Sequence, residues 1–260
     1  MVNGILGKKI GMTQVFDDQG NVHPVTVLQA GPCVITQIKR ANKDGYEAAQ
    51  IGLVEFVKGK NVTKAMQGHF GKHDLPPVKF IREVAVEDDE PAAAAASAEQ
   101  SAEQGTESQS TNGLKVGAKV LVEIFTREKY VDVIGVSKGR GFAGVVRRHH
   151  FGGGPAAHGH MFQVQGSIGA SSFPSRTFPG QRMSGHMGTD QVTVRNLKIR
   201  GIDNDDNLLL VEGAVPGPKN GYVVILKAKK PPRERRGFAG ATTIDPLKAA
   251  KKAAAGKSKK

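Results

Sequence analysis

The segment from Ser137 to Arg200 constrains the fold most, because much of it cannot join a hydrophobic core. Between Phe151 and Met187, no apolar run is long or regular enough for a core helix or strand. The segment contains a single acid, Asp190. Its basic residues number nine: Lys138, Arg140, Arg147, Arg148, Arg176, Arg182, Arg195, Lys198 and Arg200. Glycine lets a backbone approach a partner closely, and arginine reaches phosphates. The composition therefore favours a segment that lies against a polyanion.

Aromatic and imidazole side chains are interspersed among these charges. They are Phe142, Phe151, Phe162, Phe173 and Phe178, with His149, His150, His158, His160 and His186. A solvated, disordered linker rarely carries so many aromatic residues. Histidine and arginine can stack on bases and bond to phosphates. We therefore expect a nucleic-acid contact rather than a linker.

The charge of the whole chain also indicates a polyanionic partner. The 260 residues contain 37 Lys or Arg and 24 acids, a formal charge of +13, although residues 83–112 hold eight acids and no Lys or Arg. A positive charge of this size favours nucleic acid as the binding partner. An anionic membrane surface is the alternative, but no amphipathic helix with a basic face is evident. No apolar run has the length of a membrane span, and no signal-peptide pattern follows Met1. The only cysteine is Cys33, which fits a protein of the reducing cytosol.

Short β-rich runs separated by turn residues occur on both sides of the basic segment. They are Ile5–Phe16, His23–Gln29, Cys33–Ile38, Tyr46–Val54, Lys79–Val86, Ala118–Phe125, Tyr130–Val136, Gln191–Ile199, Asn207–Glu212 and Tyr222–Lys227. Residues 62–72 suit a short helix. This pattern predicts a mainly β fold, a small antiparallel β-barrel. The basic segment then becomes a long excursion from the barrel, and loops of that length usually have a function.

The expected domain organisation follows from these runs. The segments are 1–87 as the first part of the barrel, 88–112 as a disordered acidic insert, 113–137 as further barrel strands, 138–190 as an extended loop, 191–228 as closing strands and 229–260 as a disordered basic tail. Low-complexity charged stretches are usually solvated. A partner-binding role of the insert is the alternative.

Two motifs resemble catalytic or cofactor sites but lack the required context. Gly135–Gly139 matches a nucleophile elbow with Ser137 as nucleophile, yet a glycine-rich run follows where a helix is needed. Gly139–Gly144 matches a dinucleotide fingerprint, yet neither an apolar helix nor an acid follows at the expected distance. A hydrolase using Ser137 is kept as a rival hypothesis. We expect no catalytic residues and no cofactor.

The histidine pattern HHx7HxH suggests a metal site at first sight. It consists of His149, His150, His158 and His160. Structural zinc usually recruits cysteine, and no cysteine or acid lies nearby in the sequence. The neighbouring arginines would also repel a cation. We therefore expect no metal, and we expect these histidines to contact nucleic acid.

Several fragments resemble the bacterial large-subunit ribosomal protein L three family. They are ILGKKIGMTQVF, VDVIGVSKGRGFAGVVRRHHF, HGHMFQVQGSIGASSFPSRTFPGQRMSGHMG, QVTVRNLKI and NLLLVEGAVPGPKNGYVVI, which cover residues 1 to about 87 and 113 to about 228. The resemblance implies a translation-protein type barrel and an extension that passes through ribosomal RNA towards the peptidyl transferase centre. It further implies a cytoplasmic, non-catalytic protein that acts early in assembly. Its partners would be large-subunit rRNA and neighbouring ribosomal proteins, with no membrane and no small-molecule substrate.

The resemblance also implies where individual residues lie. The rising arm would carry Lys138, Arg140, Arg147 and Arg148, and the tip and returning arm would carry Arg176, Arg182, His186 and Arg195. The tip is expected near Ser167–Arg176. Two positions depart from the family: Ser172 stands where some relatives carry a methylated glutamine, so no modification is expected, and His149 stands where many have tryptophan. A nucleic-acid chaperone or regulator outside the ribosome remains the second rival.

Overall fold

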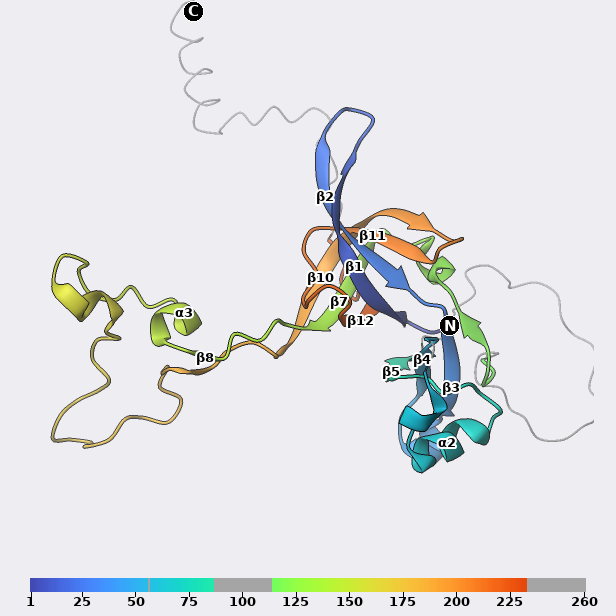
Figure 1. Cartoon of the computed structure of the whole chain (residues 1–260), viewed down its shortest axis with the longest axis horizontal. Coiled ribbons are helices and arrows are strands. Elements are labelled where there is room, and N and C mark those ends of the chain that lie inside the picture. The colour runs from blue at the N-terminus through green and yellow to red at the C-terminus, as the bar shows by residue number, and fades with distance from the viewer. Residues whose placement is uncertain (56, 87–113, 233–260) are drawn as a thin grey trace, which may run out of the picture. The chain divides into compact units, whose positions relative to one another are not determined.

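A closed antiparallel barrel of six strands lies at the centre of the computed structural model, which describes residues 1–55, 57–86 and 114–232. Around the barrel the strands follow the order β1 (Gly4–Phe16), β12 (Tyr222–Lys227), β7 (Tyr130–Val136), β10 (Gln191–Asp203), β11 (Leu208–Glu212) and β2 (Val22–Ala30) (Figure 1). The mainly β fold with an antiparallel barrel is confirmed. Closure leaves these strands without open edges where they pair.

Apolar side chains that point inward from the strands fill the barrel interior. In β12, Val223 and Ile225 are buried while Val224, between them, is half-buried on the outer side. In β7, Val131 and Val133 are fully buried, and Asp132 between them is also buried and accepts from the Asn196 N–H at 2.7 Å. β-branched residues suit a pleated surface that packs on one side. The two flanks of the basic segment therefore contribute adjacent strands to one core.

Four further strands form a second sheet rather than part of the barrel. They are β3 (Cys33–Lys39), β4 (Ala48–Leu53), β5 (Phe80–Ala85) and β6 (Lys119–Val120), in the order β5-β4-β3-β6. The prediction that all of 1–87 joins the barrel was therefore wrong for β3 to β5, and that for 113–137 was wrong for β6. Gly31, with φ +97°, and Pro32 separate β2 from β3, and the chain changes sheet there. The apolar pattern of each run does not encode which sheet it joins.

Local structure between these strands partly agrees with the predictions. A short helix within residues 62–72 is confirmed as α2 (Lys64–Gly71), which buries Phe70 and is capped by Thr63, whose hydroxyl oxygen accepts from the Met66 N–H at 3.4 Å. The single strand expected over Ala118–Phe125 is wrong. After β6, a 3-10 helix, η3 (Val122–Phe125), places both its terminal residues in the core. Two short turns of helix, α1 (Ala41–Asp44) and η1 (Gly59–Asn61), complete this region.

One hydrophobic cluster joins the two sheets. It includes Ile5 and Leu6 of β1, Ile35 of β3 and Ile51 of β4, all essentially inaccessible to solvent. The barrel and second sheet therefore share a core within the unit Met1–Lys229. Most of the predicted acidic insert and basic tail lies outside the described residues, at 87–113 and 233–260. No helix in the described ranges is long and apolar enough to cross a membrane.

Candidate nucleic-acid interface

The extension, residues 138–190, leaves the barrel as two hydrogen-bonded arms. β7 and β10 pair up to Val136 opposite Gln191, and the Ser137 N–H then donates to the Asp190 oxygen at 2.9 Å. Farther out, the Arg140 N–H donates to Met187 and the Met187 N–H to Gly141, each at 2.9 Å. The pairing ends in β8 (Phe142–Ala143) and β9 (Gly185–His186). The arms therefore form a continuous ribbon from the barrel to β8 (Figure 1).

Glycine at position 188 permits this close pairing of the arms. Gly188 has φ +86°, and a Cβ there would lie 2.2 Å from the Lys138 oxygen and 2.9 Å from the Arg140 nitrogen. Only glycine adopts this conformation readily and leaves that space free. At this position, glycine thus serves the packing of one arm against the other.

A short helix, α3 (Val145–His149), follows β8 and is tied to the returning arm. The Arg148 guanidinium Nη1 donates to the Met183 oxygen at 2.8 Å, and His149 Nε2 donates to the same oxygen at 3.1 Å. Ala143 of β8 and Val145 of α3 are buried in the same part of the extension. Arg148 and His149 are half-buried as a result, so both side chains hold the arms together.

The other ten predicted site residues are exposed. They are Lys138, Arg140, Arg147, His150, His158, His160, Arg176, Arg182, His186 and Arg195. Within the described ranges, no acidic side chain forms an ion pair with a Lys or Arg of the extension. Arg200 differs, because its Nε donates to Glu212 at 2.8 Å. The extension thus presents uncompensated positive charge, which attracts a polyanion.

Aromatic rings of the extension are exposed to an unusual degree. Phe173 is 88% and Phe142 is 80% accessible, and Phe178 and Phe162 are also exposed. These four were not among the predicted site residues. Rings with so little contact indicate a surface that a partner covers. Their occurrence in a basic, glycine-rich segment was the signal that could have placed them in the predicted site.

The four histidines of HHx7HxH do not converge on one point. His149 is directed to Met183, whereas His158 and His160 flank the start of η4 (Gly159–Gln163). That turn closes against Gly154, whose N–H donates to the Met161 oxygen at 3.1 Å. Among the described residues, no three His, Cys, Asp or Glu side chains are grouped as a metal site requires.

The two catalytic-looking motifs both lie in the ribbon. Ser137 Oγ accepts from the Asp190 N–H at 3.2 Å, and the chain continues from it as an arm hydrogen-bonded to the returning arm rather than as a helix. Gly139–Gly144 forms the rising arm, followed only by the five residues of α3. Neither geometry is that of a nucleophile elbow or a dinucleotide-binding turn.

Comparison with known proteins gives a consistent result. The family model described as Ribosomal protein L3 matches residues 107–208, which include β7, the extension and β10. A protein of Koribacter versatilis, called Large ribosomal subunit protein uL3, is 64% identical over 257 residues, which is 99% of this chain and 100% of the relative. The chain belongs to the Ribosomal protein L3 family. Members with the same name from Solibacter usitatus and Herpetosiphon aurantiacus are 49% and 47% identical, and each alignment covers 88% of this chain.

The L3 family match bears on the insert and tail as well as on the extension. The alignment with the Koribacter versatilis relative leaves only about 1% of the chain uncovered, so it includes most of 88–112 and 229–260. Those segments are thus shared with at least that L3 family member.

Proposed function

We propose that this chain is a structural constituent of the large ribosomal subunit and binds its rRNA directly through the extension. The observation that carries the proposal is a ribbon with a hydrogen-bonded interior and an exterior of unpaired cations and exposed aromatic rings. The printed name of the relatives, Large ribosomal subunit protein uL3, supports the same assignment. The chain acts as a scaffold for RNA and not as an enzyme.

Electrostatic attraction supplies most of the affinity in this proposal. Arg147, Arg176 and Arg182 are exposed and have no acidic partner, so they are available to neutralise phosphates. Each phosphate contact releases counterions, which makes binding weaken as salt rises. Arg148 and His149 contribute by holding α3 against the returning arm.

Stacking supplies selectivity for unpaired nucleotides. Phe142, Phe173 and Phe178 are mostly exposed, and so are His158, just before η4, and His160 within it. Aromatic and imidazole rings stack on the faces of unpaired bases, which is how proteins usually recognise single-stranded RNA. The rings therefore wedge into loops and junctions of the rRNA.

The extension has almost no core of its own beyond Ala143 and Val145, so RNA contacts must stabilise its outer part. We expect segments near Ser167–Arg176 to order fully only on RNA, with the tip directed towards the peptidyl transferase centre. Such interpenetration is easiest while the RNA is still open, which favours a role in early assembly. Ser172 lacks the amide of a methylated glutamine, so the tip acts unmodified.

Sedimentation tests this proposal directly. Lysate is centrifuged through a sucrose gradient at high salt, and the fractions are probed for this chain. Co-migration with the large subunit that survives high salt is expected of an extension folded into RNA. A free chain, or one removed by moderate salt, would contradict it and favour the regulator or hydrolase hypothesis.

A further inference from the structure

The hairpin tip, residues 10–24, projects beyond the barrel and is separate from the extension. β12 pairs with β1 only from Gly4 to Lys8, whereas β1 and β2 stay paired as far as Phe16 opposite Val22. Figure 1 shows this two-stranded ribbon rising from the barrel at β2. An isolated hairpin is only marginally stable in water, so something must hold the tip in place.

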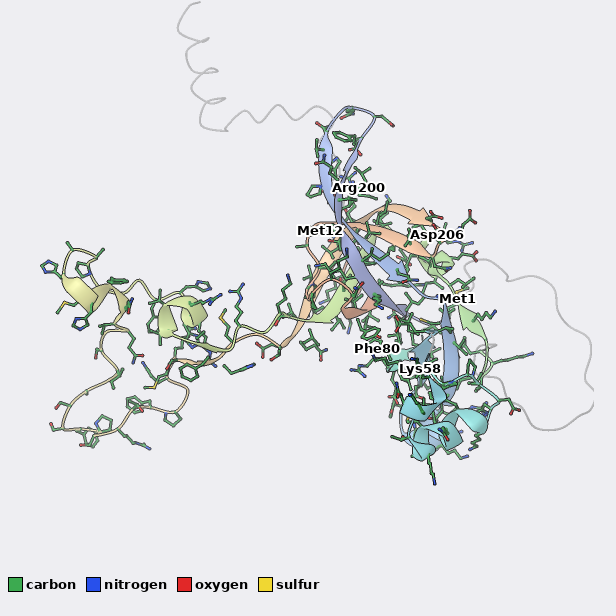
Figure 2. The ribbon with its side chains drawn as sticks, viewed as in Figure 1. Met1, Met12, Lys58, Phe80, Arg200 and Asp206 are labelled. Atoms are coloured by element: carbon green, nitrogen blue, oxygen red, sulfur yellow. The ribbon has the colours of Figure 1, made fainter. Side chains whose placement is uncertain are left out.

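Ionic contacts anchor one face of the hairpin tip. Arg200 of β10 donates from Nη2 to His23 Nδ1 at 2.9 Å and lies 3.5 Å from the Asp17 carboxylate. His23 Nε2 in turn donates to Asp17 at 2.6 Å, and Arg200 Nε bonds to Glu212 of β11. Figure 2 marks Arg200 beside the lower part of the ribbon. This network fixes the orientation of the ribbon relative to β10 and β11.

The opposite face, here called the hairpin face, is uncharged, and it is exposed beyond Thr26, which is buried and donates to the Gly213 oxygen at 2.6 Å. Residues directly opposite in an antiparallel pair share a face, and Met12, Gln14 and Phe16 lie opposite Thr26, Pro24 and Val22. Phe16 is 62%, Met12 56% and Val22 52% accessible. Three large apolar side chains thus lie exposed on a ribbon whose other face is held by ion pairs. Such a surface indicates a partner.

The charge of the hairpin tip decides the kind of partner. Residues 10–24 contain Asp17 and Asp18 and no Lys or Arg, in contrast to the extension. RNA binding needs cations against phosphates, and acids at this position would oppose it. An apolar protein surface with a basic border matches both the uncharged face and the free Asp18. An apolar anchor surrounded by a polar rim is the usual form of a protein contact.

We propose that Met12, Phe16 and Val22 dock an apolar patch on a neighbouring protein of the large subunit, whose bordering Lys or Arg side chains face Asp18. The inference rests on the proposed function, because the neighbour is a protein of that particle. The chain then has two contact surfaces of opposite character. The extension binds RNA, and the hairpin face binds protein.

Site-specific photocrosslinking in purified, salt-washed large subunits tests the docking surface. Benzoylphenylalanine replaces Phe16 in the full chain and, as the control, Val54, which is also exposed and apolar but lies just after β4. We expect one ribosomal protein to crosslink from position 16 and not from position 54, at a site flanked by Lys or Arg. Adding Met12→Ser and Val22→Ser, or Asp18→Lys alone, should lower that yield at least threefold.

Other outcomes overturn the inference. A crosslink from position 16 to rRNA, to a second copy of this chain or to nothing removes the proposed partner. The same protein crosslinked equally from position 54 shows no selectivity for the hairpin face and also overturns it. Failure of the proposed function is distinct, since the wild-type chain would then be missing from the purified subunits.

Discussion

Arg148 and Met183 lie on opposite arms of the extension and are joined by a 2.8 Å hydrogen bond from Nη1 to the main-chain oxygen. A Cβ at Gly185 would lie 2.7 Å from the same Nη1, so the guanidinium covers the returning arm. Arg147, next to it in sequence, is exposed. Adjacent arginines thus have different tasks, one holding the ribbon together and the other facing outward.

Replacing Arg148 by Ala should loosen the arms. We expect a local loss of about 1 kcal/mol, or roughly fivefold faster amide exchange, around α3 and β9, because a charged donor to a main-chain oxygen is removed. Hydrogen exchange of the free chain measures this. Arg147→Ala is the matched control and should leave exchange unchanged. Equal amide exchange in the two variants would contradict the role of Arg148 as the side chain that links the two arms.

Gly188→Ala should separate the base of the ribbon. The left-handed backbone and a contact of 2.2 Å with the Lys138 oxygen both oppose a Cβ, and we expect a local cost above about 1 kcal/mol. Exchange of the Arg140 and Met187 amides should quicken. Gly144→Ala is the control, since its φ is −70° and nothing lies within 4 Å of the added carbon. Protection retained in Gly188→Ala would show that the close approach of the two arms does not require glycine.

Phe173→Ala should weaken binding to large-subunit rRNA without lowering the melting temperature. The ring is 88% exposed, so folding gains little from it, whereas base stacking contributes about 1–3 kcal/mol per ring. Filter binding and thermal unfolding measure the two effects. Tyr46→Ala removes an exposed ring outside the extension and should leave RNA affinity near that of the wild type. A drop in melting temperature with unchanged RNA affinity would show that Phe173 stabilises the fold and does not bind RNA.

Glu212→Gln should make the free energy of unfolding less sensitive to acid. The hydrogen bond from Arg200 holds the pKa of Glu212 below its ordinary 4.5, so this carboxylate stabilises the folded state above that pH and loses its contribution as pH falls through the lowered value. The side chain is partly exposed, and the difference at pH 7 should be about 0.5–1 kcal/mol. Urea unfolding at pH 7, 5 and 3 should show the gap between wild type and variant closing. A gap that stays constant would exclude the ion pair as its source.

Much of the fold could be predicted from the sequence because its strands are short apolar runs bounded by turn residues, and some, such as Leu208–Glu212 and Tyr222–Lys227, bury every second residue. Tyr130–Val136 and Tyr222–Lys227 have the predicted bounds. Assignment to sheets failed: β3 and β4 are short apolar strands buried along most of their length, and nothing in their sequence separates them from barrel strands. The choice depends on the turn at Gly31 and Pro32 and on long-range pairing, which local sequence does not contain.

The composition of the candidate site could be predicted from the sequence. Which of its residues link the two arms and which are exposed could not. Charge and glycine content predicted an extended segment over residues 138–190, and in the structure the paired strands β7 and β10 flank those residues. Which arginine is used internally depends on the register of the two arms, and that register brings Arg148 and not Arg147 to Met183. The sequence places Phe142 and Phe173 in the basic segment, and the structure adds how far their rings are exposed.

The salt dependence of rRNA affinity tests most directly whether the unpaired cations of the extension bind phosphate. Wild type is compared with Arg140→Ala/Arg147→Ala/Arg176→Ala/Arg182→Ala, and with a control that replaces four exposed cations elsewhere, Lys58, Lys60, Lys64 and Arg127, by Ala. We predict that the slope of log affinity against log salt falls by about 3 in the extension variant and by clearly less in the control. An equal fall in both, or no fall in the extension variant, would contradict the assignment of the extension as the RNA-binding element.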